Sequence, residues 1–306
     1  MKTRGATHTP AVPAGVPGFL MRAVEGRWYR LAAELARNRR RCTEPGIHDL
    51  RVATRRLLAV LDLADAVLPG EVSSRSRRVL RRYLKSFSPL RDCHVRILLL
   101  RGLTRRFTVA RPLLREAALL QKTLVRNAGR AIARFDAARL EREISGIVSA
   151  LASLEDTPAR AAAAGTVLAG VAAEKFIRVA AREKHLSPGD TKTIHRLRVA
   201  FKEFRYTMEA LPPASGGAGR SRLKAMNAFQ DSMGEIQDIE VLIAAVGRFA
   251  LARGAAYPAS VVNLQRHLAQ RRLWLVNAFM KQTDAVAGFW SHPFFPAYPH
   301  SKGGRS

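Results

Sequence analysis

Two stretches of the chain carry the same cationic residues at the same spacing. The first begins at Ile47 and reads IHDLRVATRRLLAVLDLA, and the second begins at Ile194 and reads IHRLRVAFKEFRYTMEAL. Each contains a histidine followed three and seven residues later by a cation: His48, Arg51 and Arg55 in the first, and His195, Arg198 and Lys202 in the second. On a helix of 3.6 residues per turn this spacing places the side chains on one face. Such a row suits phosphate, whose oxygens accept charge-assisted hydrogen bonds from guanidinium and ammonium groups.

The other faces of the second stretch are apolar enough to bury the helix. They carry Leu197, Val199, Phe201, Phe204, Tyr206, Met208 and Leu211. A largely buried helix that keeps one cationic row is unfavourable by itself, because like charges one turn apart repel and desolvation adds to the cost. We therefore expect an anionic partner to neutralise the two rows. We expect Phe201, Tyr206 and Trp28 to belong to the core.

The composition indicates the same kind of partner. The chain has 306 residues with 52 basic and 24 acidic side chains, a formal charge of +28 and a pI near 11.5. This balance is typical of proteins that bind nucleic acid, an anionic membrane or chained phosphate. Arginine accounts for 42 of the basic residues, which suits bidentate contacts with phosphate. Coding bias in a chain rich in Ala and Arg explains part of the ratio of arginine to lysine.

Cysteine usage and hydropathy argue against a disulfide-rich or membrane-spanning protein. Cys42 and Cys93 are the only cysteines and form no CxxC or Cys/His metal pattern, so we expect neither a disulfide framework nor a zinc site. No uncharged apolar run approaches the ~20 residues that span a bilayer. The N-terminus also lacks the apolar core of a signal peptide. The sequence therefore predicts a cytoplasmic protein without a membrane span.

Helical periodicity runs through the chain, and no segment shows the alternation of a strand, so we predict an all-α fold. The repeat divides the chain into halves, which gives four expected segments: a flexible leader at 1–17, a first helical half at 18–155, a second helical half at 156–283, and an aromatic, proline-rich tail at 284–306. The tail is expected to dock on the body or on a partner. One long helix is predicted from Arg111 to Leu154, and its solvent-facing cationic stripe comprises Arg111, Arg115, Lys122, Arg126, Arg130 and Arg134.

The two histidine stretches resemble the signature helices of the CHAD family, the conserved histidine α-helical domain. A second family signature is a Gln-Asp pair followed by a Leu-Gly step and a later Asp. It is matched by FQDSMGEIQDIEVL, with Met233 in the place of Leu. The counterpart in the first half is LKSFSPLRDCHVRIL, which aligns Asp92 with Asp238. The resemblance covers roughly residues 18–283.

This resemblance implies two antiparallel four-helix bundles, related by pseudo-twofold symmetry around a basic central cavity, and it implies binding of inorganic polyphosphate. Some members of the family are fused to a triphosphate-processing catalytic domain. The chain has no ExExK segment typical of that domain, so a stand-alone binding module associated with polyphosphate granules is expected. In the first half, Leu58 replaces a common Arg and Ser88-Pro89 replaces a small-Gly step. We therefore expect the contacts of the two halves to differ.

A binder of polyphosphate needs dense cations, because each phosphate is charged and there are no bases to read. The predicted phosphate-binding set is His48, Arg51, Arg55, Arg56, Lys85, Lys175, Arg178, His195, Arg198, Lys202 and Arg205. The histidines would donate to phosphate when protonated. The alternative for each histidine is a structural role in which it bonds a neighbouring helix. Asp92 and Asp238 are predicted to orient the cations rather than to touch the ligand.

Other functions compete with this hypothesis. His48-Asp49 is an HD dipeptide of the kind found in metal-dependent phosphohydrolases, but the second copy reads His195-Arg196. A phosphohistidine relay is a further enzymatic alternative. Nonspecific nucleic-acid binding, as in a nucleoid-associated protein, is the main rival, because a chain of charge +28 attracts DNA and RNA at low salt. An acidic protein partner is the remaining alternative. We predict a binding protein with no metal, no cofactor and no catalytic residues, and the oligomeric state stays open.

Overall fold

The computed structural model describes residues 15–155, 158–211, 218–253, 256 and 258–290, and every regular element in these ranges is a helix, which confirms the all-α prediction. The helices are α1 Val16–Arg40, α2 Glu44–Val67, α3 Ser74–Ser86, α4 Ser88–Leu103, α5 Ala110–Ala133, α6 Ala137–Glu155, α7 Pro158–Lys184, α8 Thr191–Ala210, α9 Ala218–Arg253, α10 Pro258–Met280 and α11 Ala285–Gly288. None of these helices, as far as they are described, is both long and apolar enough to cross a bilayer.

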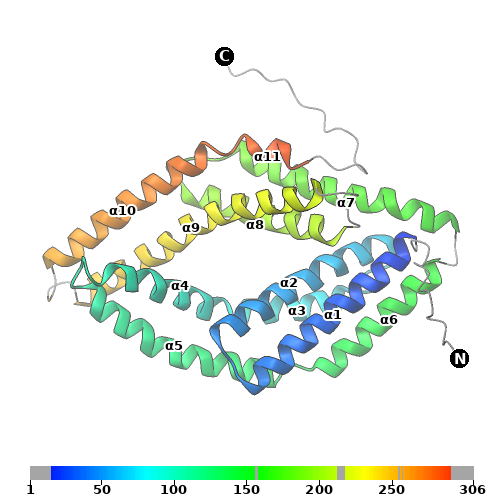
Figure 1. Cartoon of the computed structure of the whole chain (residues 1–306), viewed down its shortest axis with the longest axis horizontal. Helices are drawn as coiled ribbons and strands as arrows, with labels where there is room; N and C mark the ends of the chain where they lie inside the picture. The colour runs from blue at the N-terminus through cyan, green and yellow to red at the C-terminus, as the bar shows by residue number, and fades with distance from the viewer. Residues whose placement is uncertain (1–14, 156–157, 212–217, 254–255, 257, 291–306) are drawn as a thin grey trace, which may run out of the picture.

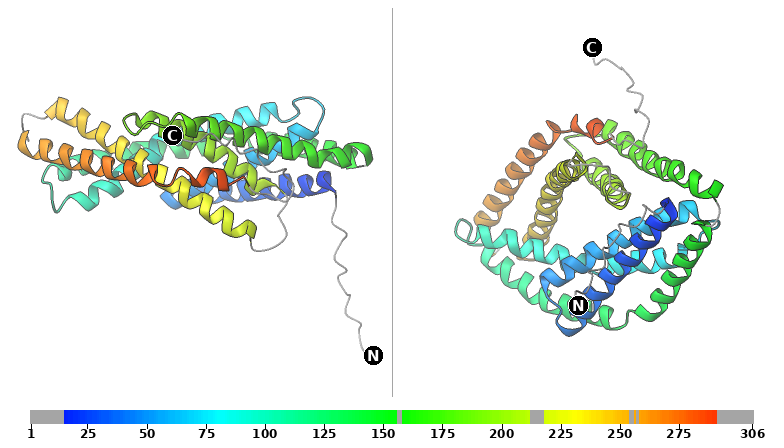
Figure 2. Two further views of the ribbon diagram at one scale, coloured as in Figure 1. Left: turned by 90° about the horizontal axis from the view of Figure 1, so that it is seen from above. Right: turned by 45° about the vertical axis from the view of Figure 1, so that its right-hand side comes forward.

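The helices pack as antiparallel neighbours that follow one another around a ring (Figure 1). Helix α1 packs on α2 and α6, α4 on α5, α7 on α8, and α9 on α10. Contacts of α2 with α8 and of α4 with α9 join the two sides of the ring. Figure 2 shows the same ring from two further directions. One continuous cluster of buried apolar residues extends through both predicted halves. The pseudo-twofold relation between the halves and the boundary at 155/156 stay predictions.

Helix α2, which carries the first histidine stretch, begins at a tightly packed turn. The Thr43 hydroxyl accepts a hydrogen bond from the backbone N–H of Gly46 at 3.2 Å and thereby caps the helix. The amide of Asn38 on α1 donates to the Gly46 carbonyl at 3.0 Å. A Cβ on Gly46 would clash with Oδ1 of Asn38 and crowd the hydroxyl of Thr43, so a larger residue would require these side chains to move. This close approach fixes α2 against α1.

Helix α8, which carries the second histidine stretch, begins at Asp190, whose carboxylate accepts from the backbone N–H of Lys192 at 3.0 Å. Phe201 and Phe204 are fully buried, as the apolar pattern predicts. Trp28 and Tyr206 also belong to the core cluster. Val199 is an exception, because its side chain is 45% exposed and it lines a cavity described below.

The single long helix predicted from Arg111 to Leu154 is wrong. Helix α5 ends at Ala133 and α6 begins at Ala137. Asp136 accepts a hydrogen bond from the backbone N–H of Arg139 at 2.9 Å, which makes it the cap of a new helix. Phe135 turns into the core, where its ring centroid lies 4.4 Å from that of Tyr83. The six cations of the predicted stripe are exposed, as expected.

The beginning of the predicted tail docks on the body. Helix α11 packs against α7. Trp290 is buried with its ring stacked on Phe176 at 4.9 Å, and the Phe289 ring lies 5.3 Å from that of Phe201. The rest of the tail, from residue 291, and most of the predicted leader, up to residue 14, lie outside the described residues.

Candidate functional site

The cationic rows of the two histidine stretches meet because α2 and α8 contact each other. Their apolar faces are buried in the core, where Leu50, Leu57 and Phe201 are fully inaccessible. The opposite faces therefore turn toward each other and toward α7. Electrostatic coupling confirms the proximity, since Arg55 and Arg51 on α2 both act on the pKa of Lys202 on α8.

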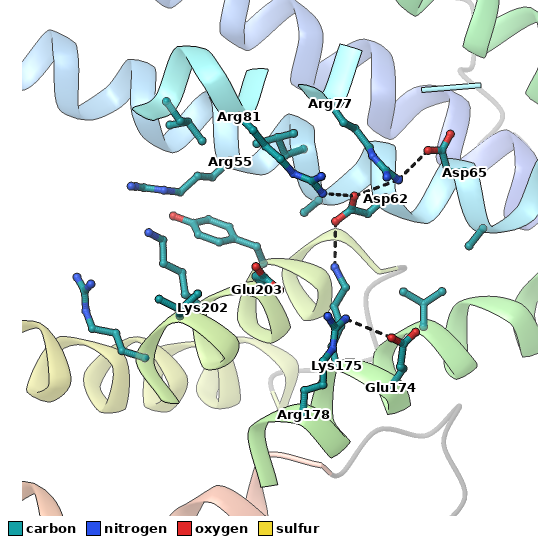
Figure 3. Close-up of a pocket in the computed structure, with 18 of the residues that line it drawn as sticks. Arg55, Asp62, Asp65, Arg77, Arg81, Glu174, Lys175, Arg178, Lys202 and Glu203 are labelled. Carbon is teal, nitrogen blue, oxygen red and sulfur yellow. Dashed lines mark hydrogen bonds and ion pairs between the residues drawn. The ribbon is translucent and has the colours of Figure 1, made fainter. Parts of the chain in front are cut away.

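A cavity of about 680 Å³ lies between α2, α3, α7 and α8 (Figure 3). Its charged lining consists of the cations Arg55, Arg77, Arg81, Lys175, Arg178, Arg198 and Lys202 and the carboxylates Asp62, Asp65, Glu71, Glu174 and Glu203. Tyr206 and aliphatic side chains such as Leu58 and Val199 complete the walls. The cavity therefore combines a cationic surplus with an aliphatic surface.

At one end of the cavity the cations are paired with carboxylates. Asp62 on α2 accepts from Lys175 Nζ on α7 at 3.0 Å and lies 3.4 Å from both Arg77 Nη1 and Arg81 Nη2 on α3. Arg77 also donates to Asp65 at 2.7 Å. Figure 3 shows Asp62 at the centre of these contacts. Arg178 lies 3.5 Å from Glu174, one turn away on α7.

The opposite end holds cations without such partners. Among the described residues, Arg55, Arg198 and Lys202 have no carboxylate within ion-pair distance. In Figure 3, Arg55 and Lys202 extend from facing helices toward the same space. The Nε of Arg198 is buried without a hydrogen-bond partner, and its guanidinium lies against Gly234 of α9. Beside the cavity, Arg51 has one buried nitrogen, Nη1, in the same condition.

The pKa values of these groups reflect the arrangement. Burial, followed by the charges of Arg55, Arg198, Arg51 and Arg91, lowers the pKa of Lys202 to about 6. Burial and the neighbouring Arg55 and Arg91 lower the pKa of Arg51 to about 10. The pKa values of Arg55 and Arg198 are also lowered, chiefly by burial. An anion at this position would relieve both the desolvation and the mutual repulsion.

The predicted orienting acids, Asp92 and Asp238, lie near the cluster of Arg51, Arg55, Arg198 and Lys202. Asp238 on α9 accepts from Arg91 on α4 at 2.5 Å, and Asp92 lies 3.2 Å from the same guanidinium. Burial raises the pKa of Asp238, and the charge of Arg91 opposes that rise. The ion pair between Arg91 and Asp238 thus connects α4 to α9 and holds Arg91 near Arg198. The charge of Arg91 lowers the pKa of Arg198, after the larger effect of burial.

The remaining predicted site residues lie away from the cavity lining. His48, His195 and Lys85 are exposed, and His195 Nδ1 lies 2.6 Å from Gln237 Oε1. Arg56 pairs with Glu209 at 2.6 Å. Arg205 is buried: it donates to Gln230 at 2.9 Å, pairs with Glu209 at 3.3 Å and stacks over the Tyr206 ring at 4.0 Å. The structure therefore brings together Arg51, Arg55, Arg198 and Lys202, and none of these five other residues lines the cavity.

Sequence reasoning missed Arg91, Arg77, Arg81 and the role of Asp62. Arg91 had a usable signal, because it precedes Asp92 in the second signature motif. Arg77 and Arg81 stand four residues apart in a basic segment, which places them on one face of a helix. The spacing does not indicate that this face packs toward α2. Asp49 of the HD dipeptide accepts a hydrogen bond from Arg37 at 2.7 Å. No three His, Cys, Asp or Glu side chains gather as a metal site within the described residues.

Comparisons with known proteins agree with this architecture. A family model described as the CHAD domain matches residues 22–247. The crystal structure of the CHAD domain from the plant Ricinus communis is similar over 90% of this chain and 97% of that chain, with a TM-score of 0.63 at 19% identity. PptA from Streptomyces chartreusis is similar over 88% of this chain and 99% of that chain, with a TM-score of 0.58 at 20% identity. No curated protein matches the chain. At these identities the two structures establish a shared fold.

Proposed function

Because the chain belongs to the CHAD domain family, we propose that it binds inorganic polyphosphate in the cavity between α2 and α8, as a binding module without turnover. One observation carries the proposal. Three cations from two repeated helices, Arg55, Arg198 and Lys202, line one partly buried space, and Arg51 lies beside it. None of the four has a carboxylate within ion-pair distance among the described residues.

The shape of the cavity favours a thin, flexible polyanion. Within a volume of about 680 Å³, a linear phosphate chain can bring several phosphates within reach of cations spaced one helical turn apart. Burial strengthens these contacts because the local dielectric is lower than that of water. A double helix is far wider than this space and would have to bind on the outer surface. The exposed cationic face of α5 is one surface that suits it, which makes nucleic acid the second candidate.

We propose further that binding of this polymer brings the protein to polyphosphate granules in the cytoplasm. A fluorescent fusion should colocalise with granules, and a variant that lacks the cavity cations should not. Diffuse fluorescence of the unmodified protein in cells that contain granules would contradict this part of the proposal.

The test compares two variants that lose the same number of cations. The cavity variant replaces Arg55, Arg198 and Lys202 with Ala, and the stripe variant replaces three exposed arginines of α5, Arg115, Arg126 and Arg130. Both are titrated with long-chain polyphosphate at low and at physiological salt. We expect the cavity variant to lose affinity by about a hundredfold and the stripe variant by less than about threefold, since exposed charges contribute little.

Competition with DNA separates the two candidates. We expect polyphosphate to displace bound duplex DNA at physiological salt, and the stripe variant to lose more affinity for DNA than for polyphosphate. Equal losses of polyphosphate affinity in the two variants would mean that the attraction is diffuse. Displacement of polyphosphate by DNA would favour the nucleic-acid function instead.

A further inference from the structure

The face of α2 that lines the cavity changes sign along its length. His48, Arg51 and Arg55 are followed at the same helical spacing by Leu58 and then by Asp62. Leu58 and Asp62 line the cavity together with Arg55. The cationic row therefore stops at Leu58, and a carboxylate stands two turns beyond Arg55.

Asp62 places a negative charge at that end of the cavity, in contact with several cations. Its ion-pair contacts are all to cations of the cavity wall: Lys175 at 3.0 Å, and Arg77 and Arg81 at 3.4 Å each. Its neighbour Asp65 has a structural contact in addition, because it accepts from the backbone N–H of Ser73 at 2.7 Å before α3. Asp62 thus neutralises cations of the cavity wall, whereas Asp65 also stabilises the turn before α3.

The charge along the cavity is divided as a result. Four of the seven lining cations are paired with carboxylates: Arg77, Arg81, Lys175 and Arg178. The three unpaired cations, Arg55, Arg198 and Lys202, lie at the opposite end of the cavity. A phosphate that moved toward α3 and α7 would meet satisfied cations and the negative charge of Asp62. Two like charges within a few ångströms in a partly buried site repel strongly. The favourable direction for the rest of the polymer is therefore away from α3 and α7.

We propose that Asp62 ends the anion-binding track, so that the cavity holds only a short stretch of phosphate chain beside Arg55, Arg198 and Lys202. This inference rests on the proposed function. Asp62 is then a specificity-determining residue that limits how many phosphates contact the protein. Its removal would extend the track onto Lys175 and Arg81, which pair with Asp62, whereas Arg77 stays paired with Asp65.

The test is Asp62→Asn, titrated with tripolyphosphate and with long-chain polyphosphate over a range of salt concentrations. We expect affinity for the long chain to rise about tenfold, with a change of less than about twofold for tripolyphosphate. The plot of log affinity against log salt should steepen by roughly one to two, because additional cations contact phosphates. The matched control is Glu116→Gln, which removes the same charge from an exposed pair with Arg253 on α9. It should leave both affinities within about twofold.

Several results would overturn the inference: an unchanged or weaker affinity for the long chain, an equal gain for both ligands, or an unchanged salt slope. If the single variant does not fold, a double variant with Asp62→Asn and Lys175→Met replaces it. The double variant removes the buried ammonium group of Lys175 together with its carboxylate partner, so it leaves no unpaired buried charge. It should still bind the long chain more tightly than the unmodified protein, because Arg81 has lost the charge of Asp62. If the unmodified protein binds neither polyphosphate, the proposed function itself fails.

Discussion

Replacing Lys202 with Met should stabilise the protein, and the gain should depend on pH. The pKa of Lys202 falls from 10.5 to about 6 in the folded protein, through burial and the charges of Arg55, Arg198, Arg51 and Arg91. Between these two values the unfolded chain holds a proton that the folded chain lacks, so stability rises with pH across this window. The cost of Lys202 to the folded state is therefore largest below about pH 6 and vanishes above about pH 10.5.

The magnitude follows from the size of this pKa shift. At pH 7.5 the unfolded-state pKa lies about three units above the pH, and each unit corresponds to 1.36 kcal/mol, so Lys202 costs about 4 kcal/mol. Methionine keeps the length of the side chain and removes the titrating group. For a chain of this size the Lys202→Met variant should melt roughly 5–10 °C higher at pH 7.5. The difference should disappear near pH 10.5.

Thermal or urea unfolding at several pH values measures this effect, with Lys122→Met on the exposed face of α5 as the matched control. The control should show no pH-dependent gain. A Lys202→Met variant that is no more stable than the unmodified protein at neutral pH would refute the reasoning. So would a stability difference that does not change between pH 7.5 and pH 10.

The same group should couple polyphosphate binding to protons. A bound polyanion raises the pKa of Lys202, so binding near pH 7.5 takes up close to one proton, and affinity falls as the pH rises further. Calorimetric titrations in buffers of different ionisation enthalpy measure the uptake. The Lys202→Met variant should show an uptake close to zero. Equal uptake in both proteins would place the coupled proton on another group.

Three further substitutions test individual contacts. Arg91→Ala should weaken polyphosphate binding about tenfold, because the loss of its guanidinium leaves the half-buried carboxylate of Asp238 unpaired close to Arg198; an unchanged titration would contradict this. Gly46→Ala should destabilise the protein by about 1–3 kcal/mol in urea unfolding, since the added Cβ clashes with Oδ1 of the buried Asn38, and unaltered stability would show that α1 shifts freely. Arg205→Lys should cost about 1–2 kcal/mol of stability because lysine keeps the charge but loses the planar stacking and the fork, and a melting curve that does not move would argue against this role.

The sequence was sufficient to predict the helices and the cationic rows, because both follow from local periodicity and from a repeat. It was insufficient to predict which cations line the cavity and which of them have a carboxylate partner. Arg205 continues the stripe of Arg198 and Lys202, but its guanidinium meets Gln230 and Glu209 from α9 and α8. Lys175 lies 113 residues from the carboxylate that neutralises it. Which cation stays unpaired is decided by such tertiary contacts, and helical spacing does not report them.

The break between α5 and α6 has a similar explanation. Helical periodicity continues across Phe135 and Asp136, and neither residue forbids a helix. The chain bends there because Phe135 gains burial against Tyr83 and Asp136 caps α6. A short capping signal is weak in the sequence alone, and it becomes decisive only when the core offers a place for the aromatic side chain.

The lowered pKa values also bear on how a polyanion would act on the fold. Each lowered pKa of Arg51, Arg55, Arg198 and Lys202 corresponds to a free-energy cost that the folded state bears and the unfolded chain does not. A bound polyanion removes this cost in the folded state alone, so it stabilises the protein by mass action. Exposed cations, such as those on α5, lose little on folding and give no comparable gain. Substitutions of the four clustered cations should therefore raise the stability of the protein alone while they lower the stabilisation that polyphosphate provides, whereas substitutions on α5 should change neither.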